Sequence, residues 1–146
     1  MRIYLDNCSY NRPYDDQKQI RINLESQAKS YIQKLIKSGE LELVSSYVLE
    51  YENSRNRYLD RKKTIKQYID NYASYYVGIA KRDVVEKMAA DIMQTGIKEK
   101  DAAHIACAIL AKCEYFISTD DRLLRYKTDK ITLVTPGEFL RRTEAK

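Results

Sequence analysis

Carboxylate side chains stand next to the short apolar stretches of this sequence. The candidates are Asp6 after residues 2–5, Glu50 and Glu52 after residues 41–44, Asp101 at the start of segment 98–112, and Asp120 and Asp121 after residues 115–118. Their oxygens are hard ligands of the kind that Mg²⁺ and Mn²⁺ prefer. A metal ion held by such groups can deprotonate a water for attack on a phosphodiester and stabilise the charge on the leaving oxygen. If these acids meet in space, the sequence predicts metal-dependent hydrolysis.

The elements around these acids predict where they lie. Apolar runs at 2–5, 41–44, 115–118 and 131–134 are expected to be strands, and helices are expected over 17–37, 61–76, 81–93, 98–112 and 137–142, with a further helix capped by Ser45 or Ser46 and a polar loop over 7–17. Strands separated by helices rather than hairpin turns are typical of a parallel sheet covered on both faces. We therefore predict an α/β fold, a three-layer α/β/α sandwich with a short central parallel sheet. In such sheets, functional groups gather at the carboxyl ends of the strands.

Each acid also has a simpler explanation. An Asp after a strand often caps a turn or a helix, which would account for Asp6 alone. Asp101 would be only a favourable charge near a helix N-terminus, and Asp120 or Asp121 would only cap the next helix. Placed together, however, the carboxylates would repel one another unless protons or cations compensated them. The convergence of acids from separate segments is what favours a metal site.

Helix geometry distinguishes the two glutamates. Positions three or four apart share a face of a helix, so Glu52 aligns with Val48 and Leu49, the apolar residues that must face the sheet. Glu50 is rotated by about 200° from Glu52 and should point outward. We therefore choose Glu52 as the candidate and keep Glu50 as the alternative.

The charge balance fits an anionic partner. The 146 residues include 26 Lys and Arg against 21 Asp and Glu, which gives a net charge of +5 and a pI of about 9.0. A basic cluster just beyond Glu52 would guide an RNA backbone, although a solvated helical face is the default for such a run. Its members are Arg55, Arg57, Arg61, Lys62 and Lys63, with Tyr58 among them as a ring on which a base could stack.

Composition and cysteine usage argue against other classes of protein. Residues 1–146 are expected to form one domain, with the 44% hydrophobic and 32% charged residues of a globular protein. Mean hydropathy is −0.60 and no apolar run approaches the roughly 20 residues of a membrane span, so we expect no membrane association and a cytoplasmic location. One His and three Cys without CxxC spacing argue against a zinc site. The lone His104 is expected to pack or hydrogen-bond rather than act as a base.

The order and spacing of these residues resemble the PIN-domain family, which includes the VapC-type toxin ribonucleases of bacterial toxin–antitoxin pairs. The resemblance spans essentially the whole chain and is carried by IYLDNCSYNRP at 3–13, SSYVLEYENS at 45–54, DAAHIACAILAKCEYFISTDD at 101–121 and the closing ITLVTP. The first three family acids match Asp6, Glu52 and Asp101. The fourth matches Asp120, because the family pattern [Ser/Thr]-x-Asp matches Ser118-Thr119-Asp120. A competing register, Thr119-Asp120-Asp121, would choose Asp121.

What the resemblance implies goes beyond the acids. It implies Mg²⁺ or Mn²⁺ held by Asp6, Asp101 and Asp120, and cleavage of single-stranded or structured RNA. Ser118 matches the family hydroxyl that orients the acid cluster. Asn11 and Arg12 would help to hold the phosphate or would serve only a surface turn. Besides RNA, the implied partners are an antitoxin protein and a second copy of the chain in a homodimer.

Two functions follow as hypotheses. The first is a metal-dependent endoribonuclease that hydrolyses RNA phosphodiester bonds as the toxin of a toxin–antitoxin pair, with Asp6, Glu52, Asp101 and Asp120 as its catalytic acids. The alternative is a catalytically inactive PIN-fold module that binds RNA or protein. Because every acid position of the family pattern is filled in this sequence, we favour the enzyme.

Overall fold

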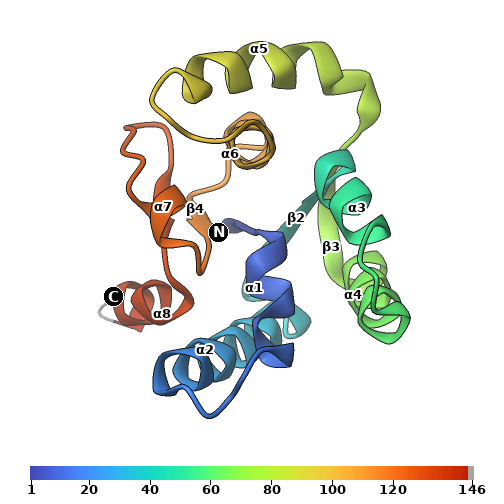
Figure 1. The fold of residues 1–146 in the computed structure, drawn as a ribbon, viewed down its shortest axis with the longest axis vertical. Helices are drawn as coiled ribbons and strands as arrows, with labels where there is room; N and C mark the ends of the chain where they lie inside the picture. Colours follow the sequence, from blue (N-terminus) through green and yellow to red (C-terminus); the bar gives the residue numbers. More distant parts are fainter. Residues whose placement is uncertain (145–146) are drawn as a thin grey trace.

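The structure is a computed structural model that describes residues 1–144 (Figure 1). The predicted single domain of residues 1–146 includes two residues, 145 and 146, that lie outside the described range. The elements in chain order are β1 (Arg2–Leu5), α1 (Asn7–Asn11), η1 (Arg12–Tyr14), α2 (Ile20–Lys37), β2 (Glu42–Ser46), α3 (Tyr47–Ser54), α4 (Leu59–Tyr72), β3 (Ala73–Val77), η2 (Ile79–Lys81), α5 (Arg82–Met93), α6 (Glu99–Leu110), β4 (Tyr115–Ile117), α7 (Asp121–Leu124), β5 (Thr132–Val134) and α8 (Pro136–Glu144).

The five strands form one parallel sheet in the order β3-β2-β1-β4-β5. Tyr4 of β1 lies beside Val44 of β2 on one side and Phe116 of β4 on the other. The chain builds the sheet outward from β1 through β2 to β3, then returns to the other side of β1 with β4. The boundary between β1 and β4 is therefore the switch point of the topology, where open parallel sheets bind their ligands beyond the carboxyl ends of the strands.

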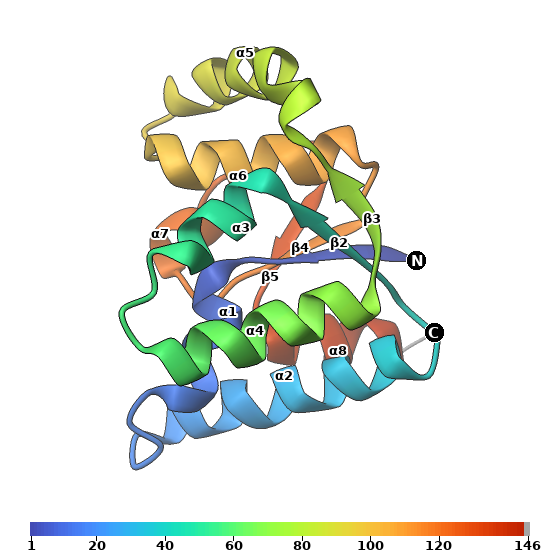
Figure 2. The ribbon, with the colours of Figure 1, turned by 90° about the vertical axis from the view of Figure 1, so that its right-hand side faces the viewer.

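Helices cover both faces of this sheet, as Figure 2 shows. On one face, Tyr4 and Phe116 pack against α5 and α6 in a core that includes Val85 and Ile105. Alternate residues of the same strands point the other way, and pack against α2, α4 and α8 in a core that contains Ile3, Leu5, Leu43, Ile32, Ile65 and Phe139. The predicted α/β/α sandwich is therefore confirmed. Within residues 1–144, no helix has the length and apolarity required to cross a membrane.

The prediction of four strands was wrong because the edge strand β3 was assigned to a helix. The predicted helix over 61–76 ends at Tyr72, and Ala73–Val77 pairs with β2 instead. Tyrosines at 68, 72, 75 and 76 sustain a helical spacing, so periodicity did not mark the boundary. Tyr75 and Tyr76 are exposed on this edge, and tyrosine suits a half-exposed strand as well as it suits an amphipathic helix.

Several boundaries were also revised. Residues 7–17 were predicted to be a polar loop, but they include the short helix α1 and the turn η1. The choice between Ser45 and Ser46 is settled at Ser46, whose side chain accepts a hydrogen bond of 3.1 Å from the backbone N–H of Leu49. Gly39 ends α2 with a φ of +84°, a conformation that favours glycine.

Truncation of a central core residue tests this packing. Leu43 lies in β2 with a fully buried side chain, so Leu43→Ala should lower the free energy of unfolding by about 2–5 kcal/mol through lost contacts and a residual cavity. Leu24→Ala is the control, because Leu24 is 59% exposed and its loss should cost well under 1 kcal/mol. Urea unfolding measures both values. Equal losses in the two variants would contradict the assigned core.

Candidate active site

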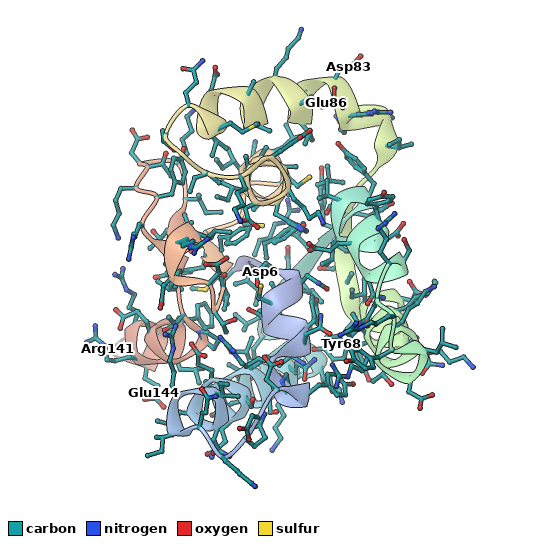
Figure 3. All side chains as sticks on the ribbon, viewed as in Figure 1. Asp6, Tyr68, Asp83, Glu86, Arg141 and Glu144 are labelled. Carbon is teal, nitrogen blue, oxygen red and sulfur yellow. The ribbon has the colours of Figure 1, made fainter. Side chains whose placement is uncertain are left out.

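Asp6 lies at the centre of the carboxyl edge of the sheet, immediately after β1 (Figure 3). It caps α1, because its Oδ1 accepts a hydrogen bond of 3.0 Å from the backbone N–H of Ser9. Its other oxygen, Oδ2, accepts a hydrogen bond of 2.6 Å from the hydroxyl of Ser118 at the end of β4. The side chain is 3% exposed. Asp6 thus caps a helix, as the simpler explanation predicted, and is also held at the switch point between β1 and β4.

Burial makes the charge of Asp6 costly. It raises the pKa of the carboxyl group to about 6, although the hydrogen bonds from Ser118 and Ser9 and the interaction with His104 act in the opposite direction. A positive charge beside Asp6 would offset this cost, because it would stabilise the ionised form of its carboxyl group.

Ser118 connects Asp6 to the segment that carries Asp120. Its hydroxyl donates to Asp6 and accepts a hydrogen bond of 3.0 Å from the backbone N–H of Asp120. Asp120 in turn caps α7, since its Oδ1 accepts a hydrogen bond of 2.9 Å from the N–H of Arg122. One fully buried hydroxyl thus fixes Asp6 and Asp120 relative to each other.

Glu52 belongs to a second hydrogen-bonded group, between α3 and α6. Its Oε1 lies 2.9 Å from Nε2 of His104, and Nδ1 of that ring lies 2.6 Å from the hydroxyl of Tyr4. The Tyr4 hydroxyl is also 2.7 Å from Oγ of Ser46, so the helix-capping serine completes the chain. His104 is 1% exposed and bonded at both nitrogens, in agreement with the packed or hydrogen-bonded role expected for it.

Hydrogen bonds and electrostatic interactions with His104 and Lys100 favour the ionised form of Glu52. Partial burial alone would raise its pKa, but the hydrogen bond and electrostatic interaction with His104, together with Lys100, outweigh burial and lower the pKa. The Nζ of Lys100 lies 3.7 Å from Oε2 of Glu52. Glu52 is therefore already compensated by groups of the protein, unlike the buried Asp6.

Asp101 lies in the first turn of α6, where the negative charges of other acids affect its pKa. Burial is the largest cause that raises its pKa, and the negative charges of Asp120 and Glu52 add to it. His104 and Lys98 act in the opposite direction without cancelling the rise. Asp101 thus lies close enough to the other acids for their charges to disfavour its ionised form.

The pKa of the Cys8 thiol on α1 is affected by the same acids. Desolvation of the thiol by the surrounding protein is the main cause that raises its pKa to about 12. The remaining causes are the negative charges of Asp6, Asp120, Glu52 and Asp101. All four predicted acids therefore act on one point beside α1, although they come from four separate segments of the chain.

The alternative candidates have other partners. Asp121 is exposed and forms a two-point ion pair with Arg21, at 2.7 and 2.8 Å, which lowers the pKa of Asp121. Glu50 is exposed and accepts a hydrogen bond of 3.0 Å from the hydroxyl of Tyr76. Asn11 donates to the backbone oxygen of Asn7 at 2.9 Å and accepts from Asn56 at 3.3 Å, so it ties the end of α1 to the segment between α3 and α4.

Sequence reasoning missed the contacts that hold the segment of Asp120 in place. Two arginines from the N-terminal part of the chain, Arg12 and Arg21, each donate a hydrogen bond of 3.3 Å to the carbonyl oxygen of Thr119, next to Asp120. The Tyr4 hydroxyl was also missed. Its signal in the sequence was a hydroxyl within an otherwise aliphatic strand, whereas nothing in the sequence linked Arg21 to a partner 100 residues away.

The donor chemistry fits a hard divalent cation better than the present spacing does. In the described part of the chain, no three His, Cys, Asp or Glu side chains are arranged to hold one ion. Carboxylates are nevertheless the ligands that Mg²⁺ and Mn²⁺ prefer. Within residues 1–144, Asp6, Asp101 and Asp120 also form no ion pair with Lys or Arg. Asp101 and Asp120 are only partly buried and can adjust toward an ion, so this ligand set stays a prediction.

The raised pKa of Asp6 predicts a pH dependence of stability. The folded protein retains a proton that the unfolded chain loses near its ordinary pKa of 3.8, so stability from this residue falls as pH rises from about 4 to about 6. The rise in pKa corresponds to about 3 kcal/mol. Asp6→Asn should therefore gain stability over the wild type across this window, as measured by urea unfolding in EDTA. A difference between the two proteins that does not change with pH would contradict the assignment.

Comparison with known proteins supports the fold. No protein-family model and no curated protein matches this sequence. Among solved structures, the chain is similar to one in the crystal structure of VapBC2 from Rickettsia felis bound to a DNA fragment from their promoter, with a TM-score of 0.54 and 12% sequence identity. The match covers 91% of this chain and 97% of that one. At this identity the likeness concerns the fold alone, and it agrees with the predicted PIN-like α/β/α architecture.

Proposed function

We propose that this protein is a metal-dependent endoribonuclease that hydrolyses RNA phosphodiester bonds. One observation carries the proposal: Asp6 is buried at the switch point of the sheet, and the charges of Asp101 and Asp120 act together with its own on the neighbouring thiol of Cys8. Within residues 1–144, these three aspartates form no ion pair with Lys or Arg. Such an arrangement costs stability, and its chemical use is to bind a cation. The likeness in fold to a chain of a VapBC2 structure supports this choice among the functions open to acidic clusters.

Within this proposal the acids have distinct tasks. Asp6, Asp101 and Asp120 would hold Mg²⁺ or Mn²⁺, which when bound supplies an activated water and stabilises the leaving oxygen. Ser118 fixes the orientation of Asp6 through its hydroxyl. Glu52, kept ionised by His104 and Lys100, would accept a proton or orient a water at the rim. Asp121 and Glu50 are left out, because their partners hold them away from this group.

The cleavage of a labelled single-stranded RNA in the presence of Mn²⁺ tests the proposal. Asp101→Asn should lose more than about 100-fold in rate, since removal of a mere outer-shell partner of a metal already costs 10- to 100-fold. Glu52→Gln should also be impaired, whereas the matched exposed variants Asp121→Asn and Glu50→Gln should retain most activity.

Two controls make this assay decisive. EDTA should abolish cleavage by the wild type, and circular dichroism should show that each variant is folded. Cleavage that survives in Asp101→Asn would identify a contaminant or another site. If folded wild-type protein, free of any bound inhibitor, cuts no RNA, the inactive binding module would replace the enzyme as the better account.

We also propose an antitoxin-like protein as a partner. The similar solved chain comes from a crystal structure of VapBC2 bound to a DNA fragment from their promoter. This likeness supports an antitoxin-like protein as a partner. Co-expression with a small DNA-binding protein encoded by a neighbouring gene should give a complex that survives gel filtration and suppresses RNA cleavage. The homodimer stays a prediction that the elution volume of the isolated chain would test.

A further inference from the structure

A shallow hollow lies between η1 and the segment that joins α3 to α4. It has a volume of about 610 Å³ and is lined by Tyr14, Arg57, Tyr58, Leu59, Asp60 and Arg61. The guanidinium of Arg61 lies 3.9 Å from the ring centre of Tyr58 and 4.8 Å from that of Tyr14. Arg57 lies 5.2 Å from the ring centre of Tyr58. Both tyrosines remain partly accessible, since Tyr14 is 38% and Tyr58 is 46% exposed.

Several exposed arginines of the protein form ion pairs with carboxylates. Arg82 pairs with Glu86, Arg141 with Glu138, and Arg21 with Asp121. Within residues 1–144, Arg57 and Arg61 form no such ion pair, and instead lie against tyrosine rings. Their charge is therefore available to an external anion, while the rings beside them offer flat apolar surface. This pairing of features is what binds a single-stranded nucleic acid.

The hollow is connected to the acidic edge of the sheet. Tyr14 belongs to η1, which directly follows the helix that Asp6 caps, and Tyr58 closely follows the helix that carries Glu52. A hydrogen bond of 3.3 Å from Asn56 to Asn11 ties these two segments together. Figure 2 shows both segments on the same side of the molecule as the start of α6 and α7. A strand of RNA seated in the hollow can thus continue toward the acids.

We propose that this hollow is a base-stacking subsite that takes an unpaired nucleotide of single-stranded RNA. The base stacks on the accessible rings of Tyr14 and Tyr58, and the adjacent phosphates pair with Arg57 and Arg61. This inference rests on the proposed function, because it assigns the substrate a position beside the same acids. It also gives the protein a preference for unpaired RNA, since bases inside a duplex expose no face to a side chain.

Binding of a fluorescein-labelled RNA of eight nucleotides to the full chain tests this subsite. The experiment uses fluorescence anisotropy in EDTA, so that it does not depend on metal or cleavage. Loss of a stacking ring typically weakens binding by about 5- to 100-fold, which we expect for Tyr58→Ala, and Arg61→Gln should also weaken binding. Tyr58→Phe should bind like the wild type, because stacking needs the ring and not the hydroxyl.

Matched controls come from the rest of the chain. Tyr75 is 37% exposed and lies 4.6 Å from the guanidinium of Arg2, at a strand edge away from the acids, so Tyr75→Ala should leave binding unchanged. Arg82→Gln serves as the control for charge. The chain contains no Trp, so Tyr58→Trp introduces a single tryptophan, whose fluorescence stacked unlabelled RNA should quench, whereas the fluorescence of Tyr75→Trp should not respond.

The outcomes separate this inference from the proposed function. Weaker binding by Tyr58→Ala and Arg61→Gln, with quenching of Tyr58→Trp, supports the subsite even if no RNA is ever cleaved. Equal binding by the wild type, Tyr58→Ala and Arg61→Gln overturns the subsite, while a metal-dependent nuclease would still stand. Binding of a perfectly paired duplex as tightly as the single strand would also overturn it.

Discussion

The arrangement of this protein depends on the burial of one carboxylate at the end of its central strand. Asp6 is almost fully enclosed, and its pKa rises to about 6 because burial disfavours the ionised form. Hydrogen bonds from Ser118 and Ser9 hold the side chain without supplying a full positive charge. A parallel sheet makes this possible, since β1 is flanked on both sides and its carboxyl end opens at the switch point.

The other acids at the carboxyl edge of the sheet are stabilised to different extents. The charge of Glu52 is stabilised within the protein by His104 and Lys100. The hydrogen bonds then continue from His104 through Tyr4 to Ser46 inside the core. Asp6 and Asp120 accept hydrogen bonds, and within residues 1–144 neither they nor Asp101 form an ion pair with Lys or Arg. Arg12 and Arg21 approach this edge but bind the carbonyl of Thr119, so they position the loop rather than neutralise Asp120. The result is a sheet edge whose negative charge these two arginines do not offset.

Sequence reasoning predicted the layers, because these follow from local patterns. Buried strands are recognised in a sequence as apolar runs. An acid directly after such a run lies at the carboxyl end of the strand. β3 was missed because its tyrosines are exposed and continue a helical spacing. The ion pair of Arg21 with Asp121 was also beyond prediction, since a contact across 100 residues has no local signal. That pair shows why two adjacent aspartates have different surroundings.

The central claim is that uncompensated carboxylates make this edge a cation site, and Mn²⁺ binding tests it most directly. Electron paramagnetic resonance detects free Mn²⁺, so titration of the metal into the protein counts the ions that are bound. The account predicts saturable binding by the wild type, displaced by Mg²⁺, and its loss in folded Asp101→Asn and Asp6→Asn but not in Asp121→Asn. Folded wild-type protein that leaves all the Mn²⁺ free at millimolar concentration would contradict it.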